Sequence, residues 1–435
     1  MTLPRHLLIA LLSGCAAMAA LAGPASTSVT VQPDGRTPTA WRALTPEEAE
    51  RFEIGHAVFN TSWLPAGEGN GRRDGLGPVF NAPSCDACHN SRRRGRGPQG
   101  AGPAPNDLVL QVAHRTAGGI VDGHPRFGHI INTDAIAGFV PEAAVAITYH
   151  PVERRRADDQ LQRLYRPAYR ITPSDGHPLP DDLVLKPRMA SSVLGAGLLE
   201  QVPEAAILAG ARAGHGRPSW RDTAQGRRLG RFGWQATEPD IAAQTAAAFS
   251  REMGLTTAAI PHDDCATHDV ACRRAAQGGA PEVDATLFDA VVAFQQFETM
   301  RRTPDAARQL ADDPEGASLF ARTGCADCHR PSLPTRAGGT IAAYTDLLLH
   351  DLGPGLADRD VHGVPVPSLW RTAPLWGMST ALEGGRPVRL LHDGRACSID
   401  EAIGWHDGDA ADSRARFDRL DAVTRARLVA WISAL

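Results

Sequence analysis

The chain has 435 residues, of which 43% are hydrophobic and 22% charged, so it can bury a sizeable core and is not a disordered protein. Its 45 basic and 49 acidic side chains give a formal net charge of −4, which excludes a strongly basic nucleic-acid binder. The length predicts about two to four domains, and the 43 glycines and 33 prolines predict long ordered loops rather than a coiled coil.

The N-terminus has the pattern of an export signal. Arg5 and His6 precede an apolar run at 7–12, which is shorter than the roughly 20 residues that a membrane span needs. Two processing sites fit, namely the string LSGC, in which Cys15 would be lipidated, and an A-x-A string that ends at Ala22. We therefore expect residues 1–22 to be a signal and the mature protein to lie in the periplasm, either released or held by a lipid anchor.

Two C-x-x-C-H strings contain four of the eight cysteines. This pattern is typical of covalent c-type haem attachment. The two thiols form thioether bonds to the haem vinyl groups, and the histidine that follows them ligates the iron from one face. The sequence therefore predicts two covalently bound haem c groups, attached through Cys85, Cys88, Cys325 and Cys328, with His89 and His329 as iron ligands.

Two other kinds of site use closely spaced cysteines. A thioredoxin-like redox dithiol needs no following histidine, yet both strings have one. A zinc finger pairs its cysteines with two spaced histidines, and the sequence shows no such pair. Haem attachment is therefore the favoured interpretation of both strings.

A helical pattern precedes each string. Thr45, Pro46 and Glu48 have the spacing of an N-cap, a first helical residue and a reciprocal cap. The helix that they begin contains GHAVF (55–59), and GASLF (316–320) precedes the second string in the same way. The small, apolar and aromatic residues of these segments are typical of the first helix of a cytochrome c domain, in which glycine permits close contact between helices.

The C-terminal region predicts two further helices. Ser398 and Glu401 mark the beginning of the first one, and His406 lies at its end. A second helix is expected over about 415–434, where apolar residues recur at helical spacing. A histidine fixed at a helix end beside a haem site is a candidate sixth iron ligand, and a surface histidine is the alternative.

Four longer strings resemble a known family. They are DGLGPVFNAPSCDACH, YTDLLLHDLGPGLAD, TAPLWGM and LLHDGRACSIDEAIGWHDGDA. They are similar to the di-haem oxidoreductase family, which is related to bacterial di-haem cytochrome c peroxidases and MauG-type enzymes and is sometimes labelled thiol oxidoreductase. The resemblance spans residues 45–435 and is strongest at 74–89 and 317–408.

The resemblance implies a route for electrons. A small periplasmic donor, a cytochrome c or a cupredoxin, would reduce the C-terminal haem, and the N-terminal haem would then reduce hydrogen peroxide or another small oxidant. His406 falls where the peroxidases carry a methionine, which implies a second haem with two histidine ligands and a lower reduction potential.

The resemblance also implies a carboxylate that acts as general acid and base at the N-terminal haem. Glu200 and Glu204 are the candidates, and a role at a helix start is their alternative. Four histidines downstream of the first string are candidates for the open iron face, and their spacing selects none of them: His114, His124, His129 and His150.

Other features leave alternatives open. Cys265 and Cys272 form either a disulfide or a pair of free thiols. The arginine-rich segment 91–97 either binds haem propionates or is a solvated loop. The sequence also leaves open whether a calcium ion binds between the two lobes. The competing functions are a non-enzymatic electron carrier and a thiol oxidoreductase or iron-acquisition accessory.

We therefore expect a mainly α fold with two cytochrome c-like haem lobes, long loops and minor β structure. The expected divisions are the signal at 1–22, an N-terminal haem domain with an extension at 41–210, a mostly helical connection at 211–304 and a C-terminal haem domain at 305–435. Within the extension, LVLQVA and AVAITY predict short strands.

Overall fold

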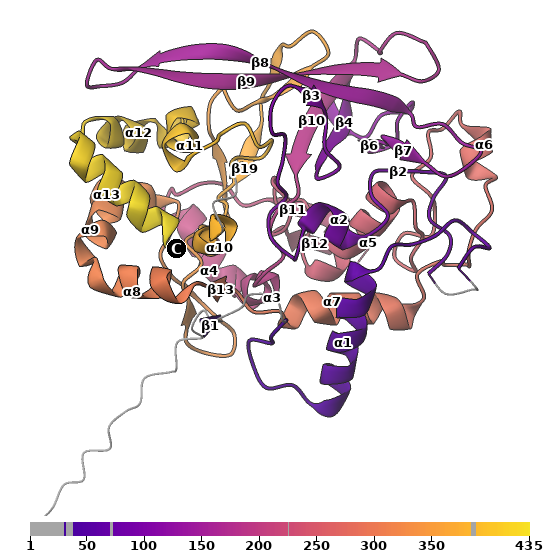
Figure 1. The fold of residues 1–435 in the computed structure, drawn as a ribbon, viewed down its shortest axis with the longest axis horizontal. Helices are drawn as coiled ribbons and strands as arrows, with labels where there is room; N and C mark the ends of the chain where they lie inside the picture. The colour runs from indigo at the N-terminus through magenta and orange to yellow at the C-terminus, as the bar shows by residue number, and fades with distance from the viewer. Residues whose placement is uncertain (1–29, 32–37, 70–72, 225, 384–388) are drawn as a thin grey trace, which may run out of the picture.

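The computed structural model describes residues 30–31, 38–69, 73–224, 226–383 and 389–435, so the predicted signal and Cys15 lie outside the described residues. The structure is 31% helix and 23% strand, and the expectation of a mainly α fold with minor β structure was wrong. Long strands in the first half of the chain account for the difference (Figure 1). Among the described residues, none of the helices combines the length and the apolar character needed to cross a bilayer.

The largest sheet of the described residues has six strands and joins the two halves of the sequence. Its order is β18-β17-β10-β4-β5, and β6 also pairs with β4. The strands are β4 (Leu108–Thr116), β5 (Gly119–Asp122), β6 (Ile130–Ile131), β10 (Leu183–Met189), β17 (Asp358–Asp360) and β18 (Pro365–Val366). Strand β10 is buried at most positions, as expected for a central strand that is covered on both faces.

A long hairpin forms the second sheet. Strands β8 (Ala143–Arg155) and β9 (Leu161–Pro173) pair along their whole length, and the short β3 (Gly102–Pro103) adds to β8. Burial alternates along the first half of β8, so one face of the hairpin packs on the core and the other faces solvent. Figure 1 shows the hairpin crossing the whole molecule and reaching the C-terminal helices.

The first C-x-x-C-H string lies among three helices. It forms α2 (Cys85–His89), which packs near α1 (Pro46–Asn60), α5 (Ile241–Met253) and α7 (Ala285–Phe297). Thr45 and Glu48 make the predicted reciprocal cap of α1. A Cβ on Gly55 would lie 1.9 Å from the carbonyl oxygen of Ala290, so only glycine allows α1 to pack this closely on α7.

The second string lies among the C-terminal helices. The short helix η1 (Cys325–Asp327) follows α8 (Pro304–Asp312) and α9 (Pro314–Arg322), and α11 (Ile399–Trp405), α12 (Ala411–Asp418) and α13 (Ala422–Ser433) pack against them. A Cβ on Gly316 would lie 2.3 Å from the Trp431 ring of α13, so this glycine also permits a close contact. The single helix predicted over 415–434 is two helices, because Asp421 caps a new one.

The remaining elements are short. They are β1 (Thr30–Val31), β2 (Val79–Phe80), β7 (Asp134–Ala135), α3 (Ala196–Glu200), α4 (Glu204–Arg212), β11 (Trp220–Thr223), β12 (Gly226–Leu229), α6 (Val270–Arg273), β13 (Arg301–Arg302), β14 (Leu333–Pro334), β15 (Thr340–Ile341), β16 (Leu349–Asp351), β19 (Leu369–Arg371), α10 (Met378–Ala381) and η3 (Gly408–Ala410). Cys265 and Cys272 form a disulfide, which confirms the first of the two alternatives for this pair.

Charged contacts hold the β8–β9 hairpin on the C-terminal helices. Arg154 donates to both carboxylate oxygens of Asp418 at 2.5 and 3.0 Å and also to Gln162, its cross-strand neighbour. Gln162 in turn donates to the Asp400 carboxylate at 2.7 Å. The Asp418 side chain is only 4% exposed, so its charge depends on Arg154 for compensation.

We expect Arg154→Ala to lower the free energy of unfolding by about 3 kcal/mol, because it leaves a buried carboxylate without its partner. Chemical denaturation measures this loss. The matched control is Arg163→Ala on the same hairpin, where the Arg163 and Glu153 side chains are more than half exposed and lie 3.6 Å apart. That change should cost less than about 0.5 kcal/mol, and equal losses for both variants would contradict the prediction.

Candidate functional site

The first C-x-x-C-H string presents two thiols and an imidazole from one short helix. Ser84 caps α2 by accepting from the backbone N–H of Ala87 at 3.2 Å. Cys85 and Cys88 are free thiols rather than a disulfide. Burial raises the pKa of Cys85 to about 12, and burial also raises the pKa of Cys88 well above its usual value. A redox dithiol needs a lowered thiol pKa, so this environment does not fit the thioredoxin-like alternative.

His89 is held in the tautomer that a metal ligand needs. Its Nδ1 donates to the carbonyl oxygen of Ser191 at 2.7 Å, which leaves the lone pair of Nε2 available. Burial lowers the pKa of His89, so the imidazole is neutral. Ser191 lies just after β10, and the central sheet therefore fixes the orientation of this imidazole.

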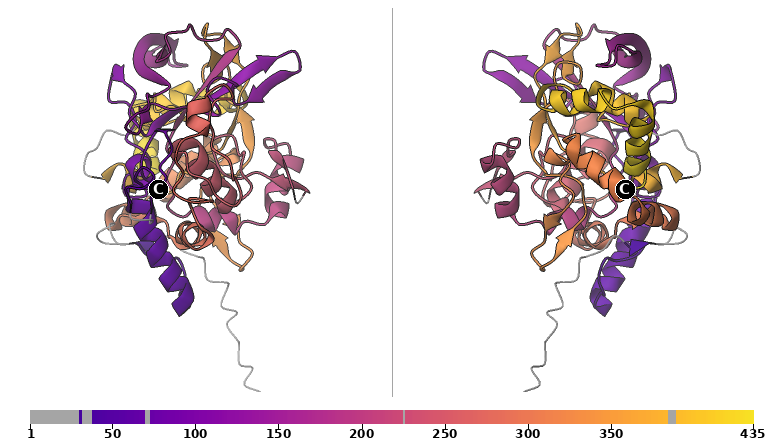
Figure 2. Two further views of the ribbon diagram at one scale, coloured as in Figure 1. Left: turned by 90° about the vertical axis from the view of Figure 1, so that its right-hand side faces the viewer. Right: turned by 90° about the vertical axis from the view of Figure 1, so that its left-hand side faces the viewer.

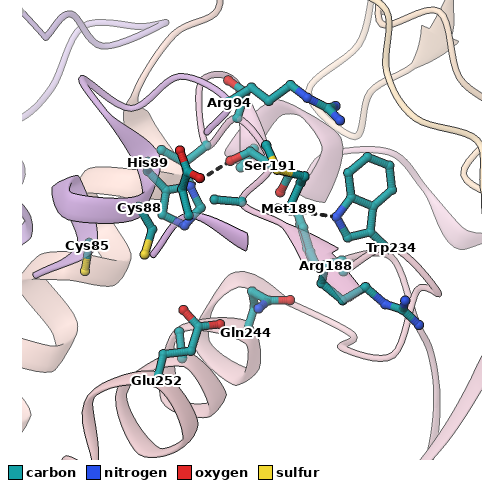
Figure 3. Close-up of a pocket in the computed structure, with 18 of the residues that line it drawn as sticks. Cys85, Cys88, His89, Arg94, Arg188, Met189, Ser191, Trp234, Gln244 and Glu252 are labelled. Atoms are coloured by element: carbon teal, nitrogen blue, oxygen red, sulfur yellow. Dashed lines mark hydrogen bonds between the residues drawn. The ribbon is translucent and has the colours of Figure 1, made fainter. Parts of the chain in front are cut away.

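A cavity of about 270 Å³ opens beside this string (Figure 3). Cys85, Cys88 and His89 lie on one wall, and Gln244 and Glu252 point into the cavity from α5 on the facing wall. Ala248 lies between them at helical spacing and also lines the cavity. The small side chain of Ala248 leaves room for a flat group between α5 and His89.

Glu252 is the carboxylate that the sequence interpretation missed. Its removal from water raises its pKa to about 7. A carboxyl group with this pKa both gives and takes protons near neutral pH. The only sequence signal for it is the spacing of Gln244, Ala248 and Glu252 on one face of an alanine-rich helix.

The two carboxylates that the sequence favoured do not line the cavity. Glu200 accepts from the backbone N–H of Ile241 at 3.0 Å and from Nε2 of Gln296 at 2.8 Å, so it ties the beginning of α5 to α7. Glu204 lies in the first turn of α4, and its side chain is 47% exposed.

The four downstream histidines also lie away from the cavity. His114 contacts the carbonyl oxygen of Gly123, His124 contacts Asp182, His129 contacts Asp264, and His150 is exposed on β8. Among the described residues that line the cavity, His89 is the only histidine. The structure therefore brings one imidazole to this cavity.

Two half-buried arginines line the cavity and make no ion pair within 4.0 Å among the described residues. Arg94, from the arginine-rich segment 91–97, donates to the carbonyl oxygens of Arg389 and Leu391, and Arg371 donates to that of Gly233. Burial lowers the pKa of each to about 10, so both remain cationic at neutral pH. Their positive charge is complementary to the two propionates of a haem.

The second C-x-x-C-H string has another histidine near it, His406. His329 directs its Nδ1 at the carbonyl oxygen of Tyr344, at 3.1 Å, and His406, the C-cap of α11, directs its Nδ1 at that of Ala402, at 2.7 Å. Both Nε2 atoms therefore keep a lone pair for a metal. Burial and the nearby His406 lower the pKa of His329 to about 4. The structure thus brings together the two imidazoles that the sequence singled out.

A smaller group of polar side chains touches the second string. Nδ1 of His350 lies 3.6 Å from Sγ of Cys328, and Nε2 of His350 lies 2.9 Å from the Asp346 carboxylate. Within the described residues these three side chains are the group that could hold a metal ion. A structural zinc site takes four ligands, so this group does not fit the zinc alternative.

Both strings fit a covalently bound haem. Each offers two free thiols and one neutral imidazole whose Nδ1 is already hydrogen-bonded. The two sites differ in what lies near that imidazole. A cavity that Gln244 and Glu252 also line adjoins the first imidazole, and the His406 side chain is near enough to the second to lower its pKa.

Comparison with known proteins places the chain in a family. Residues 174–435, more than half of the chain, match the family described as "Di-haem oxidoreductase, putative peroxidase". A comparison with curated proteins returns no match. A hydrazine synthase structure from Kuenenia stuttgartiensis, pressurised with 20 bar xenon, is similar over 100% of both chains, at 12% identity and a TM-score of 0.37. That likeness is too weak to support an argument, but the family match shows that the chain belongs to the di-haem oxidoreductases.

Proposed function

We propose that the protein is an exported di-haem c-type cytochrome that reduces hydrogen peroxide or a related small oxidant. The observation that carries this proposal is the difference between the two C-x-x-C-H sites. One imidazole lines a cavity at the first site, whereas at the second site His406 lies close enough to His329 to lower its pKa. An open site suits chemistry on a small substrate, whereas a site with two histidine ligands suits electron transfer.

Each site has residues for its haem. Cys85, Cys88 and His89 would hold one haem, while Cys325, Cys328, His329 and His406 would hold the other. When bound at the first site, haem supplies the iron that binds the oxidant and passes electrons to it. Arg94 and Arg371 neutralise propionates at that site.

We assign the general acid–base role to Glu252 rather than to Glu200 or Glu204. Reduction of hydrogen peroxide moves a proton from one oxygen to the other, and the outer oxygen then leaves as water. The Glu252 carboxylate takes the first proton and returns it to the leaving oxygen. The Gln244 side-chain amide, about two turns away on the same face of α5, would donate a hydrogen bond that orients the bound oxidant.

Two electrons and two protons complete the reaction by converting the remaining oxygen to a second water; the protons come from solvent and the electrons from outside the chain. We propose that a small periplasmic cytochrome c or cupredoxin delivers the electrons one at a time to the second site, from which they pass to the first. The disulfide between Cys265 and Cys272 supports a location outside the cytoplasm, because such bonds persist in oxidising compartments. The proposal includes removal of the signal, either by lipidation at Cys15 or by cleavage after Ala22.

Spectroscopy on the holoprotein tests the proposal. We expect electron paramagnetic resonance to show one high-spin and one low-spin haem, cyanide to bind only the high-spin one, and hydrogen peroxide to oxidise a reduced cytochrome c catalytically. Two low-spin haems that bind no cyanide, with no peroxide turnover, would instead identify a simple electron carrier.

A further inference from the structure

An arginine-rich surface stands out from the body of the protein. In Figure 2 it comprises α4, the β11–β12 hairpin and the loop between them, the part of the chain over residues 204–229. Five of its arginines are exposed to solvent: Arg212, Arg217, Arg221, Arg227 and Arg228. We call the described residues in this stretch, 212–224 and 226–228, the arginine surface.

Positive charge dominates this surface. Arg228 pairs with Asp240 at 2.6 Å, but Arg212, Arg217 and Arg221 make no ion pair within the described part of the chain. Asp222 is the one acidic residue between positions 212 and 228. The chain as a whole carries a net charge of −4, so this concentration of positive charge contrasts with the rest of the molecule. Such a field attracts negatively charged partners from a distance.

The arginine surface also exposes an aromatic ring. Trp220 is 39% exposed, and the guanidinium of Arg227 lies 5.1 Å from the centre of its ring. Trp220 is fixed in register with Leu229 on the neighbouring strand. Tryptophan and arginine are the residues most often responsible for binding energy in protein interfaces. The surface therefore combines long-range attraction with a rigid contact.

The arginine surface lies directly over the second C-x-x-C-H site. The backbones of Arg217 and Leu349 exchange hydrogen bonds of 2.9 and 2.8 Å. A Cβ on Gly216 would lie 2.7 Å from Cε1 of His350, and His350 in turn lies 3.6 Å from Sγ of Cys328. One buried imidazole thus separates this surface from a thiol that attaches the second haem.

We propose that the arginine surface docks the acidic face of a small electron-donor protein. The donor's metal loses one electron, and the haem attached at Cys328 gains it, so no proton transfer is needed. This inference rests on the proposed function, since it requires haem at the second site. It adds the place at which the donor binds and the sign of the donor's charge.

The test uses one donor in two charge states. The probes are a reduced lysine-rich cytochrome c and the same protein after its lysines are succinylated, which makes it acidic. Stopped-flow absorption measures the rate at which each reduces the low-spin haem of the holoprotein. We expect the acidic form to react at least about tenfold faster at low salt and to lose that advantage as ionic strength rises.

Charge reversal locates the docking surface. We expect Arg217→Glu with Arg221→Glu to slow reduction by the acidic probe at least about tenfold. The matched control, Arg155→Glu with Arg163→Glu, makes the same charge change at exposed positions on the β8–β9 hairpin and should change the rate less than about twofold.

The outcomes of these experiments distinguish failure of the docking surface from failure of the proposed function. Excess dithionite, a small reductant, should reduce the low-spin haem of every variant completely. If it does and both double variants react alike with the acidic probe, the docking surface is wrong and the proposed function stands. If no low-spin haem is present, the proposed function itself fails. Binding of anionic vesicles or RNA to these arginines, with donor rates unchanged by charge reversal, would also overturn the inference.

Discussion

Replacing Glu252 with glutamine should lower kcat/KM for hydrogen peroxide by about 10² to 10⁴-fold, the usual loss when a general acid–base is removed. Glutamine has nearly the same shape as glutamate, so the wall formed by α5 is preserved. It cannot take the proton that leaves the first peroxide oxygen. The measurement is steady-state oxidation of a reduced cytochrome c at varied peroxide concentration.

The kcat/KM of the wild-type protein should depend on pH through the ionisation of Glu252. Burial raises the pKa of Glu252 to about 7, so the carboxyl group is protonated below that pH. Only the ionised form accepts a proton from peroxide, and we therefore expect wild-type kcat/KM to rise with pH through about 7 and then level off. The glutamine variant should lack this rise.

Glu204→Gln is the matched control. Its side chain is 47% exposed and outside the cavity, so kcat/KM should stay within about twofold of wild type. A large loss in the Glu204 variant together with full activity in the Glu252 variant would return the acid–base role to the carboxylate that the sequence favoured.

Replacing His406 with alanine should convert the second haem from low-spin to high-spin, because the iron loses one of its two imidazoles. We expect two high-spin signals by electron paramagnetic resonance and cyanide binding at both haems. His406→Met should instead keep the low-spin state and raise the reduction potential of that haem, since methionine ligation favours the reduced iron. A potentiometric titration followed by absorption measures the shift.

His150→Ala is the control for this pair of variants, because His150 is exposed on β8 and contacts neither string. It should leave both spin states and both potentials unchanged. An alanine variant at position 406 whose spectra match those of wild type would show that another group ligates the second iron.

Local signals in the sequence predicted local structure well. The cap formed by Thr45 and Glu48 and the end of α11 at His406 are both present. The glycines of GHAVF and GASLF do permit the close contacts expected of them. Each of these features depends on residues a few positions apart, or on a steric demand that only glycine meets.

The β structure was underestimated for a physical reason. Beyond its first half, β8 has no buried positions and is mostly polar, as is much of β9. Only the short run AVAITY therefore has an evident strand pattern. The rest of the hairpin is held by Arg154 and Gln162 against helices more than two hundred residues away. Contacts at such a distance leave no local signal in the sequence.

Some residues of the candidate site could also be predicted from local sequence, and others could not. The spacing within C-x-x-C-H identifies the thiols and the proximal imidazoles by itself. The carbonyl oxygen that orients His89 belongs to Ser191, 102 residues further along the chain, and Glu252 reaches the cavity only because α5 packs opposite α2. Glu200 has the right chemistry but is committed to the beginning of α5, a role that only the packed structure reveals.

Intact mass spectrometry of the mature, exported protein, combined with the absorption spectrum of its reduced pyridine adduct, tests the central claim most directly. We predict a mass that exceeds that of the polypeptide by two haems, and a spectrum typical of haem held by two thioether bonds. Replacement of Cys325 and Cys328 by serine should remove one of the two. A colourless protein with the mass of its amino acids alone would contradict the account.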